Sequence, residues 1–233
     1  MYKGKYILFE GVDFSGKSTL SHLVLDKLQV ASWPTGPIQL TSHPGATNLG
    51  KHLRVLSKTP QVFNENIVID PLSRQLLMFI DQICFINTIL IPWLEDGGMM
   101  LADRSNYISG IVYGLTQGAT LQSLNRMFGI AKSPAPDIVF IVQTPFDIII
   151  ERRLKDQRSS IRDTFDADTE FMRKICTFYD NLLTANQDVL LLLSDYVPLE
   201  RIVYIDGTRP PDELVDIVIE RIKSLIMKTA TTA

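Results

Sequence analysis

Short runs of consecutive apolar residues alternate along the chain with longer segments in which apolar residues recur every three or four positions. The short runs predict buried strands, and the longer segments predict amphipathic helices. We expect strands at 6–9, 37–41, 99–102, 138–142 and 202–205. We expect helices at 18–28, 48–57, 71–93, 145–155, from 169 onward and at 211–227, with two more between 103 and 136. Segment 188–198 fits both a helix end and a strand.

This alternation also predicts the fold class. Strands separated by helices of about ten or more residues form βαβ units, which build a parallel sheet covered by helices on both faces. The chain has 233 residues, a length that suits one or at most two domains. It shows no internal repeat and no linker-like stretch. We therefore expect one α/β domain over residues 1–233.

A glycine-rich motif follows the first predicted strand and opens the first predicted helix. Residues 11–18, Gly-Val-Asp-Phe-Ser-Gly-Lys-Ser, match the phosphate-binding pattern Gly-x-x-x-x-Gly-Lys-Ser/Thr. The glycines let successive backbone N–H groups face an anion, and the helix N-terminus adds partial positive charge. Lys17 is expected to reach the β- and γ-phosphates of a nucleotide, and Ser18 to coordinate Mg²⁺.

Other features narrow the choice among proteins with this loop. A GTPase would need an Asn-Lys-x-Asp motif, which the sequence lacks. The apolar run at 99–102 ends in Asp103-Arg104. An arginine beside a carboxylate on the metal side suits a site that holds a second phosphate group.

Several motifs, in order along the chain, resemble the thymidylate kinase family of nucleoside monophosphate kinases. They are the phosphate-binding loop at 10–19, the Pro-Gly segment at 41–50, the helix at 77–79, the Asp-Arg motif at 103–114 and the turn at 205–211. The resemblance implies a three-layer P-loop kinase fold with a five-stranded parallel sheet and an arginine-rich lid at about 152–168. It implies ATP-dependent phosphorylation, with Mg²⁺, of a deoxynucleoside monophosphate, above all dTMP to dTDP, in dTTP or modified-pyrimidine nucleotide biosynthesis.

The resemblance also implies roles for individual residues. The implied catalytic residues are Lys17, Asp13, Arg104, Arg153, Arg158 and Arg162. Those implied to bind ATP are Gly11, Ser15, Gly16, Lys17, Ser18, Thr19 and Arg209. Those implied to bind the acceptor nucleotide are Asp13, His43, Phe79, Gln82, Ile83, Arg104, Ser109, Gly110 and Tyr113. The implied metal ligands are Ser18 and Asp103.

Some positions depart from the family pattern. Phe14 stands where some members carry a catalytic arginine, so the lid arginines are expected to supply the transition-state cation. Ile83 stands where the family has an arginine that contacts thymine O4, although Gln82 shares a helical face with Phe79. His43 replaces a glutamate of the bacterial members. The accepted base could therefore be thymine, a modified pyrimidine or that of another deoxynucleotide.

Composition and charge bear on partners and compartment. The chain has 23 basic and 26 acidic residues and a net charge of −3, whereas nucleic-acid binders are usually basic. Cys84 and Cys176 are too few for a disulfide framework, and we expect reduced, buried thiols. The start of the chain lacks the apolar run of a signal peptide, and the tract at 79–93 looks too short and polar to span a membrane. We expect a cytoplasmic enzyme with small nucleotides as partners, and the resemblance implies a homodimer through the helix at 71–93.

Two other functions stay open at this point. A deoxynucleoside kinase would share the phosphate-binding loop, but such enzymes usually carry a glutamate after the second strand, where residues 41–44 have none. A non-catalytic ATP-binding module is the more remote alternative. Lys17, Asp103 and the lid cations count against it.

Overall fold

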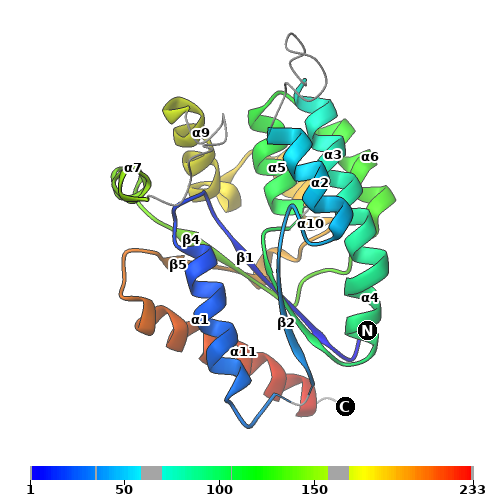
Figure 1. Cartoon of the computed structure of the whole chain (residues 1–233), viewed down its shortest axis with the longest axis vertical. Helices are drawn as coiled ribbons and strands as arrows, with labels where there is room; N and C mark the ends of the chain where they lie inside the picture. Colours follow the sequence, from blue (N-terminus) through cyan, green and yellow to red (C-terminus); the bar gives the residue numbers. More distant parts are fainter. Residues whose placement is uncertain (1, 35, 59–69, 106, 157–167, 232–233) are drawn as a thin grey trace.

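The sheet at the centre of the fold is parallel throughout. The computed structural model describes residues 2–34, 36–58, 70–105, 107–156 and 168–231. The strands are β1 (Lys5–Glu10), β2 (Ile38–Ser42), β3 (Met99–Asp103), β4 (Ile138–Gln143) and β5 (Ile202–Asp206). They are hydrogen-bonded in the order β2-β3-β1-β4-β5, and every pair runs parallel (Figure 1). The expected five-stranded α/β architecture is confirmed.

The helices lie close to their predicted ranges. They are α1 (Lys17–Gln29), α2 (Asn48–Lys58), α3 (Pro71–Phe85), α4 (Ile91–Glu95), α5 (Tyr107–Thr116), α6 (Leu121–Ala131), α7 (Phe146–Lys155), α9 (Thr169–Asp180), α10 (Gln187–Ser194) and α11 (Pro211–Thr231). Segment 188–198, which fitted both a helix end and a strand, contains most of α10. The Asn186 side chain accepts a hydrogen bond from the Val189 N–H and so caps the start of this helix. Residues 152–155 of the predicted lid belong to α7, and 157–167 lie outside the described residues.

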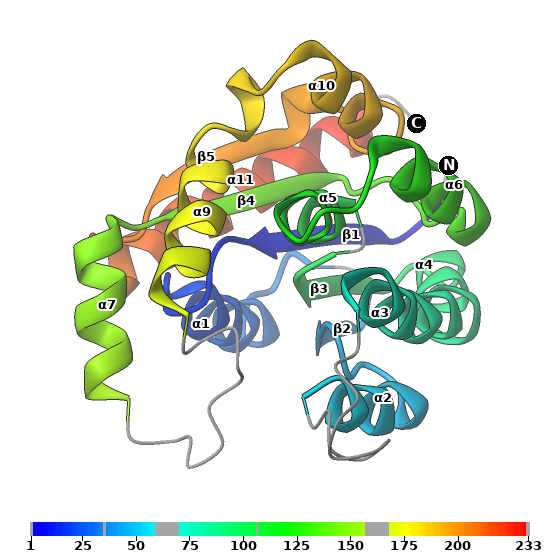
Figure 2. The ribbon, with the colours of Figure 1, turned by 90° about the horizontal axis from the view of Figure 1, so that it is seen from above.

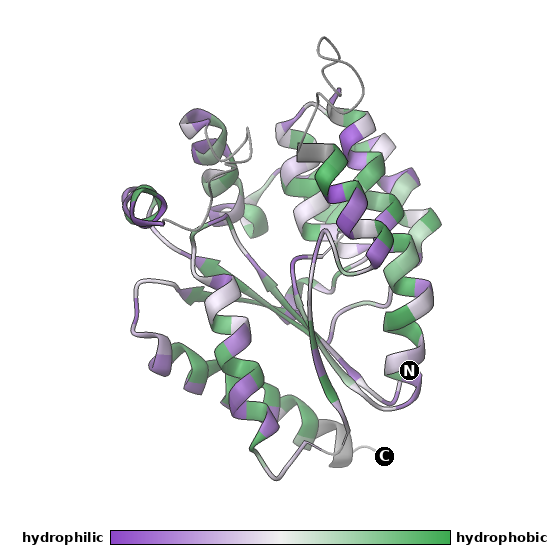
Figure 3. Cartoon of the chain, viewed as in Figure 1, coloured by the Kyte–Doolittle hydropathy of each residue, from purple (hydrophilic) through white to green (hydrophobic). Residues whose placement is uncertain are grey.

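Helices cover both faces of the sheet, because alternate residues of a strand point to opposite sides. Ile7 and Phe9 of β1 pack with α1 and α11 on one face. Tyr6 and Leu8 pack on the other face with α3, α5, α6, α9 and α10 (Figure 1, Figure 2). Figure 3 shows mostly hydrophobic residues along the central strands and mixed character around the helices. The three-layer arrangement is therefore the one expected.

The long helix after residue 70 contains one wide turn. α3 leads into a π-helical turn at Ile86–Leu90, which leads into α4. Within an α-helix, a proline ring clashes with the carbonyl four residues earlier, and Pro92 has no N–H to donate. A wider turn just before Pro92 accommodates the ring without ending the helix.

The expectation that the tract at 79–93 is too short and too polar to cross a membrane is wrong for the helix that contains it. Leu72–Glu95 forms 24 residues of helix with mean hydropathy 1.7, which suffices by length and composition. However, Asp81 near its middle is buried and accepts hydrogen bonds from Gly45 N at 2.7 Å and Thr47 Oγ1 at 2.8 Å. A buried carboxylate bonded within the chain is typical of a helix that packs in a folded core.

Polar residues gather at the edge of the sheet where the strands end. β1 ends in Glu10, β2 in Ser42 and β3 in Asp103. The register pairs Asp103 with Phe9 on one side and with Ser42 on the other. Ligands of open parallel sheets bind outside this edge, so the candidate site is expected here.

Candidate active site

The loop between β1 and α1 adopts the backbone conformation that its glycines permit. Gly11 and Gly16 have φ values of +139° and +101°, which residues with side chains rarely adopt. A Cβ at Gly11 would lie 2.8 Å from the carbonyl oxygen of Val142. Gly16 is the N-cap of α1, and no side chain in the part of the chain that the structure describes caps the first N–H groups of this helix. Those groups are available to an anion, as the motif predicts.

The lysine of the loop lies between two carboxylates. Lys17 Nζ is 3.1 Å from Asp13 Oδ1 and 3.9 Å from Asp103 Oδ1. Its side chain is almost fully buried. The ammonium of Lys17 therefore lies where the motif places the phosphates of a nucleotide.

The two predicted metal ligands meet beside this lysine. Ser18 Oγ donates a hydrogen bond to Asp103 Oδ2. Asp103 Oδ1 is buried and accepts no hydrogen bond from any residue that the structure describes. Hydroxyl and carboxylate oxygens are ligands that Mg²⁺ prefers, and Mg²⁺ takes its remaining ligands from phosphates and water. The pair therefore fits a Mg²⁺ ion that arrives with a nucleotide.

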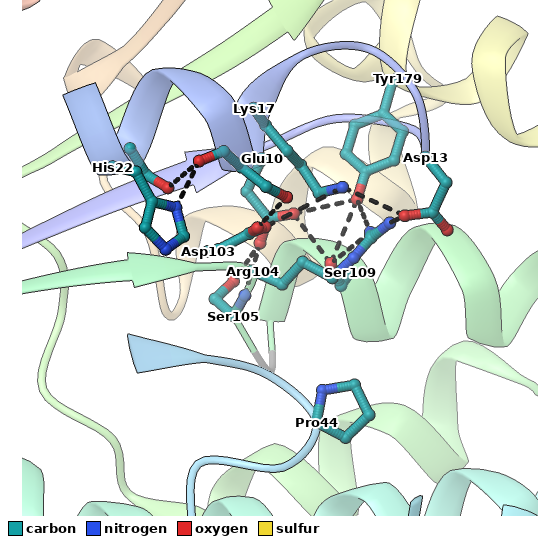
Figure 4. Close-up of polar contacts among 12 residues, drawn as sticks. Glu10, Asp13, Lys17, His22, Pro44, Asp103, Arg104, Ser105, Ser109 and Tyr179 are labelled. Carbon is teal, nitrogen blue, oxygen red and sulfur yellow. Dashed lines mark hydrogen bonds and ion pairs between the residues drawn. The ribbon is translucent and has the colours of Figure 1, made fainter. Parts of the chain in front are cut away.

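Arg104, the residue after β3, turns toward the phosphate-binding loop. Its φ of +78° is left-handed, a conformation that costs about 1–2 kcal/mol for a residue with a Cβ. Nη2 donates to Asp13 Oδ1 at 2.7 Å (Figure 4). It also donates to the hydroxyl of Tyr113 at 3.0 Å. The guanidinium carbon lies 5.0 Å from the centre of the Tyr113 ring. Asp13 and Arg104, whose roles were predicted separately, are thus in direct contact.

The Asp13 carboxylate is shared by two cations. Desolvation opposes its ionisation, but Arg104 and then Lys17 hold the pKa of this carboxyl well below its usual range. The side chain is nevertheless half-exposed. Asp13 is therefore a permanently charged acceptor at the mouth of the site.

A buried carboxylate that the sequence analysis missed lies behind Arg104. Glu10 accepts hydrogen bonds from Ser105, Ser109 and Tyr179, and the hydroxyls of the last two lie 3.4 Å from Arg104 Nη1. Burial raises the pKa of Glu10, while Arg104 and the three hydroxyl donors lower it. The position of Glu10 directly before Gly11 was the one feature of the sequence that could have indicated a place in the site. Nothing in the sequence around Tyr179 indicates such a place.

A cavity of about 250 Å³ opens beside Arg104. Six residues predicted to bind the acceptor line it together with Asp13 and Arg104, namely His43, Phe79, Gln82, Ser109, Gly110 and Tyr113. α3 forms one wall and α5 another. α9 adds a third wall through Phe171, Met172 and Ile175, which the sequence did not predict. Ile83 is not among the lining residues and packs half-buried against the main apolar cluster.

His43 is a buried polar residue of this cavity. It is 5% exposed, and its ring meets the Phe85 ring edge-on with centres 4.4 Å apart. Neither ring nitrogen has a hydrogen-bond partner among the described residues. Burial lowers the pKa of His43 to about 4, although Asp81 and Asp103 act in the opposite direction. A neutral imidazole carries one donor and one acceptor, and both nitrogens are buried in this structure.

The predicted ATP-side and lid residues are only partly brought together. Arg209 lies exposed in the turn after β5, with its Nε 3.9 Å from Asp206. Arg153 contacts α9 instead of the loop, with Nη1 3.4 Å from Thr169 Oγ1. Thr19 is exposed on α1. Arg158 and Arg162 lie outside the described residues.

Arg152, expected as a mobile lid cation, instead joins the loop to the turn after β5. Its Nη1 donates to the Ser15 carbonyl at 2.9 Å, and its Nη2 to the Gly207 carbonyl at 2.8 Å. These bonds connect the phosphate-binding loop to the turn that contains Arg209.

Several known proteins are similar in sequence to this chain over most of its length. The family model for thymidylate kinase matches residues 9–197. Thymidylate kinase of Malacoplasma penetrans is 28% identical over 205 residues, covering 86% of this chain and 92% of the relative. That of Pelotomaculum thermopropionicum is 28% identical, covering 92% and 95%. That of Caldicellulosiruptor saccharolyticus is 31% identical, covering 74% and 80%. The chain therefore belongs to the thymidylate kinase family.

Proposed function

We propose how the residues of this site carry out the reaction of the family, the ATP-dependent phosphorylation of dTMP to dTDP. One observation carries the proposal: Lys17 and Arg104 approach the same oxygen of Asp13 from different elements. Lys17 belongs to the phosphate-binding loop, and Arg104 lines the neighbouring cavity. Transfer between two nucleotides requires this arrangement, with one cation for each phosphate group.

The loop is proposed to bind the ATP phosphates through its backbone and Lys17. Gly11, Ser15, Gly16 and Thr19 belong to the same loop and helix start. Phosphoryl transfer needs alignment and charge stabilisation, and little covalent work by the protein. A Mg²⁺ ion held by Ser18 and Asp103 would neutralise phosphate charge when bound. Lys17 would do the same for the transferred group.

The acceptor phosphate is proposed to bind Arg104. Asp13 would then accept a hydrogen bond from the sugar 3′-hydroxyl, because an ionised carboxylate suits a hydroxyl donor. Tyr113 would pack against the deoxyribose. Ser109 and Gly110 occupy the same wall, on α5.

The base is proposed to stack on Phe79, with hydrogen bonds from Gln82 and His43. All three residues are more than nine-tenths buried and line the cavity. The Gln82 amide offers a donor and an acceptor, and so does the neutral His43 ring. Thymine presents one N–H and two carbonyl oxygens, which match this set. Ile83 would support Phe79 and Gln82 from behind, on the same helix.

The ATP side and the lid complete the proposal. Arg209 would contact the adenine side of ATP, since Arg152 ties its turn to the loop. A cation from Arg153, Arg158 or Arg162 would approach the transferred group when the lid closes and would help to exclude water.

The decisive experiment measures ATP consumption and product formation with dTMP, other deoxynucleoside monophosphates and thymidine. We expect dTDP to form from dTMP. We expect no phosphorylation of thymidine, because thymidine has no phosphate group for Arg104 to bind. Phosphorylation of thymidine would instead indicate a deoxynucleoside kinase. ATP binding without any product would indicate a non-catalytic module.

We also propose that residues 1–233 form one catalytic domain that works as a homodimer in the cytoplasm. The support for a dimer is the helix at Leu72–Glu95, in which only 28% of an 18-residue apolar window is buried within the chain. Its exposed apolar residues include Leu72, Leu76 and Ile80, spaced one helical turn apart. A second copy of the chain would cover this stripe.

A further inference from the structure

Glu10, the last residue of β1, has no exposed surface and four hydrogen-bond donors. Oε1 accepts from the N–H and from the hydroxyl of Ser105, each at 2.7 Å. Oε2 accepts from Ser109 Oγ at 2.8 Å and from the Tyr179 hydroxyl at 2.9 Å (Figure 4). The loop after β3, helix α5 and helix α9 thus converge on one buried carboxylate.

The two hydroxyls on Oε2 connect Glu10 to Arg104. Arg104 Nη1 lies 3.4 Å from Ser109 Oγ and 3.4 Å from the Tyr179 hydroxyl, and it can only donate. Each hydroxyl has a single hydrogen. When that hydrogen points to Glu10, a lone pair of the same oxygen is free to face Arg104. An ionised Glu10 therefore keeps both hydroxyls in the orientation that accepts from the guanidinium.

The two sides of the guanidinium have different surroundings. Nη2 is bonded to Asp13, which is half-exposed at the mouth of the cavity. A phosphate that binds there must take over this side. Nη1 instead faces the hydroxyl of half-buried Ser109 and that of buried Tyr179. A guanidinium anchored through Nη1 keeps its orientation while Nη2 exchanges a carboxylate for a phosphate.

We propose that Glu10 is a positioning residue for the acceptor phosphate: through Ser109 and Tyr179 it holds the Arg104 guanidinium in the orientation that binds the phosphate group of dTMP. This inference rests on the role proposed above for Arg104. A second observation supports it, because burial raises the pKa of Glu10 and Arg104 is the foremost group that lowers it. Arg104 therefore favours the ionised form of Glu10.

The test compares two ligands that differ only by the phosphate, dTMP and thymidine. Glu10→Gln keeps the size of the side chain and removes its charge. We expect the affinity for dTMP, measured by calorimetry, to fall about tenfold, because a charged hydrogen-bond network is disrupted. The affinity for thymidine should not change. In steady-state assays the KM for dTMP should rise, while the KM for ATP stays the same.

Tyr179→Phe removes one of the two connecting hydroxyls and should weaken dTMP binding in the same selective way. The double variant with Glu10→Gln should lose less than the product of the two single losses, because both residues act through one connection. Tyr107→Phe is the matched control. Tyr107 is buried in the same apolar cluster, but its hydroxyl donates to the Ser133 carbonyl. It should bind both ligands as the unmodified chain does.

Equal losses for dTMP and thymidine, or no loss for dTMP, would overturn the proposal. Arg104→Ala, measured with the same ligands, separates this from a failure of the proposed function. If Arg104→Ala does not reduce the preference for dTMP, the role of Arg104 is wrong. If Arg104→Ala reduces the preference for dTMP but Glu10→Gln and Tyr179→Phe leave it unchanged, only the role of Glu10 is wrong. Should Glu10→Gln fail to fold, Tyr179→Phe decides alone.

Discussion

Asp13 Oδ1 accepts a hydrogen bond from Arg104 Nη2 at 2.7 Å, and the same oxygen lies 3.1 Å from Lys17 Nζ. One carboxylate oxygen thus bridges a cation of the phosphate-binding loop and a cation of the acceptor cavity. Phosphoryl transfer needs positive charge on both sides of the group that moves. The phosphoryl group is therefore proposed to move from the ATP phosphates beside Lys17 to the acceptor phosphate beside Arg104.

Arg104→Ala should reduce kcat/KM for dTMP by about 2–4 kcal/mol of transition-state stabilisation, mainly through a higher KM for dTMP. The reason is that the acceptor phosphate loses its cation. Steady-state kinetics with dTMP as the varied substrate measures the effect. Arg126→Ala removes an exposed arginine of α6 and should leave kcat/KM unchanged. Normal activity of Arg104→Ala would show that the phosphate binds elsewhere.

Lys17→Ala should abolish phosphoryl transfer and leave the fold intact. The motif assigns Lys17 to the β- and γ-phosphates, and removing a transition-state cation lowers kcat about 10²-fold or more. Lys27→Ala is a matched control, because Lys27 lies in the last turn of the same helix and is exposed. Product formation and circular dichroism are measured together. Substantial turnover by folded Lys17→Ala would contradict the proposed role.

The parts of the site with local sequence signals could be predicted. Glycines at 11 and 16 are required by the positive φ of a tight loop, and that requirement is visible in the motif itself. Asp103-Arg104 directly follows a buried apolar run, so its place at the edge of the sheet follows from the strand alone. The five strands could also be predicted from the sequence, because each is a short apolar run between helical segments.

Contacts between distant segments could not be predicted in this way. Glu10 and Tyr179 are bonded across 169 positions of sequence, and a tyrosine on an amphipathic helix has no local mark of such a role. Arg152 belongs to the charged run at 152–168 that the resemblance assigns to the lid. Its bonds to the Ser15 and Gly207 carbonyls exist only because α7 packs beside both turns.

Gln82→Leu should raise the KM for dTMP about tenfold or more and leave the KM for ATP unchanged. Leucine keeps the volume of the side chain but leaves the base edge without its hydrogen bonds, and an unpaired buried polar group is unfavourable. Gln122→Leu, on the exposed side of α6, is the control. An unchanged KM for dTMP in Gln82→Leu would show that other lining residues, such as Arg74 or Gln117, bind the base.

His43 should make the protein less stable as the pH falls. Its pKa is about 4 in the folded chain, against about 6.5 in an unfolded one, so the unfolded chain binds the proton first. Between pH 7.5 and pH 5 this difference lowers the free energy of unfolding by about 2 kcal/mol. Urea denaturation at both pH values measures it. His43→Leu should show a pH dependence smaller by that amount. A pH dependence equal to that of the unmodified chain would mean that His43 takes up its proton at the same pH in the folded and the unfolded chain.

Placing a charge on the exposed stripe of α3 should separate the two copies of the proposed homodimer. Leu76 and Ile80 are 43% and 46% exposed and lie one turn apart, so an aspartate at either position would be buried unpaired in the interface. Sedimentation should give a dimer for the unmodified chain and a monomer for Leu76→Asp or Ile80→Asp. Ile130→Asp, at a 67% exposed position of α6, should stay dimeric. A monomeric unmodified chain, or a dimeric Leu76→Asp/Ile80→Asp double variant, would show that this helix does not form the contact.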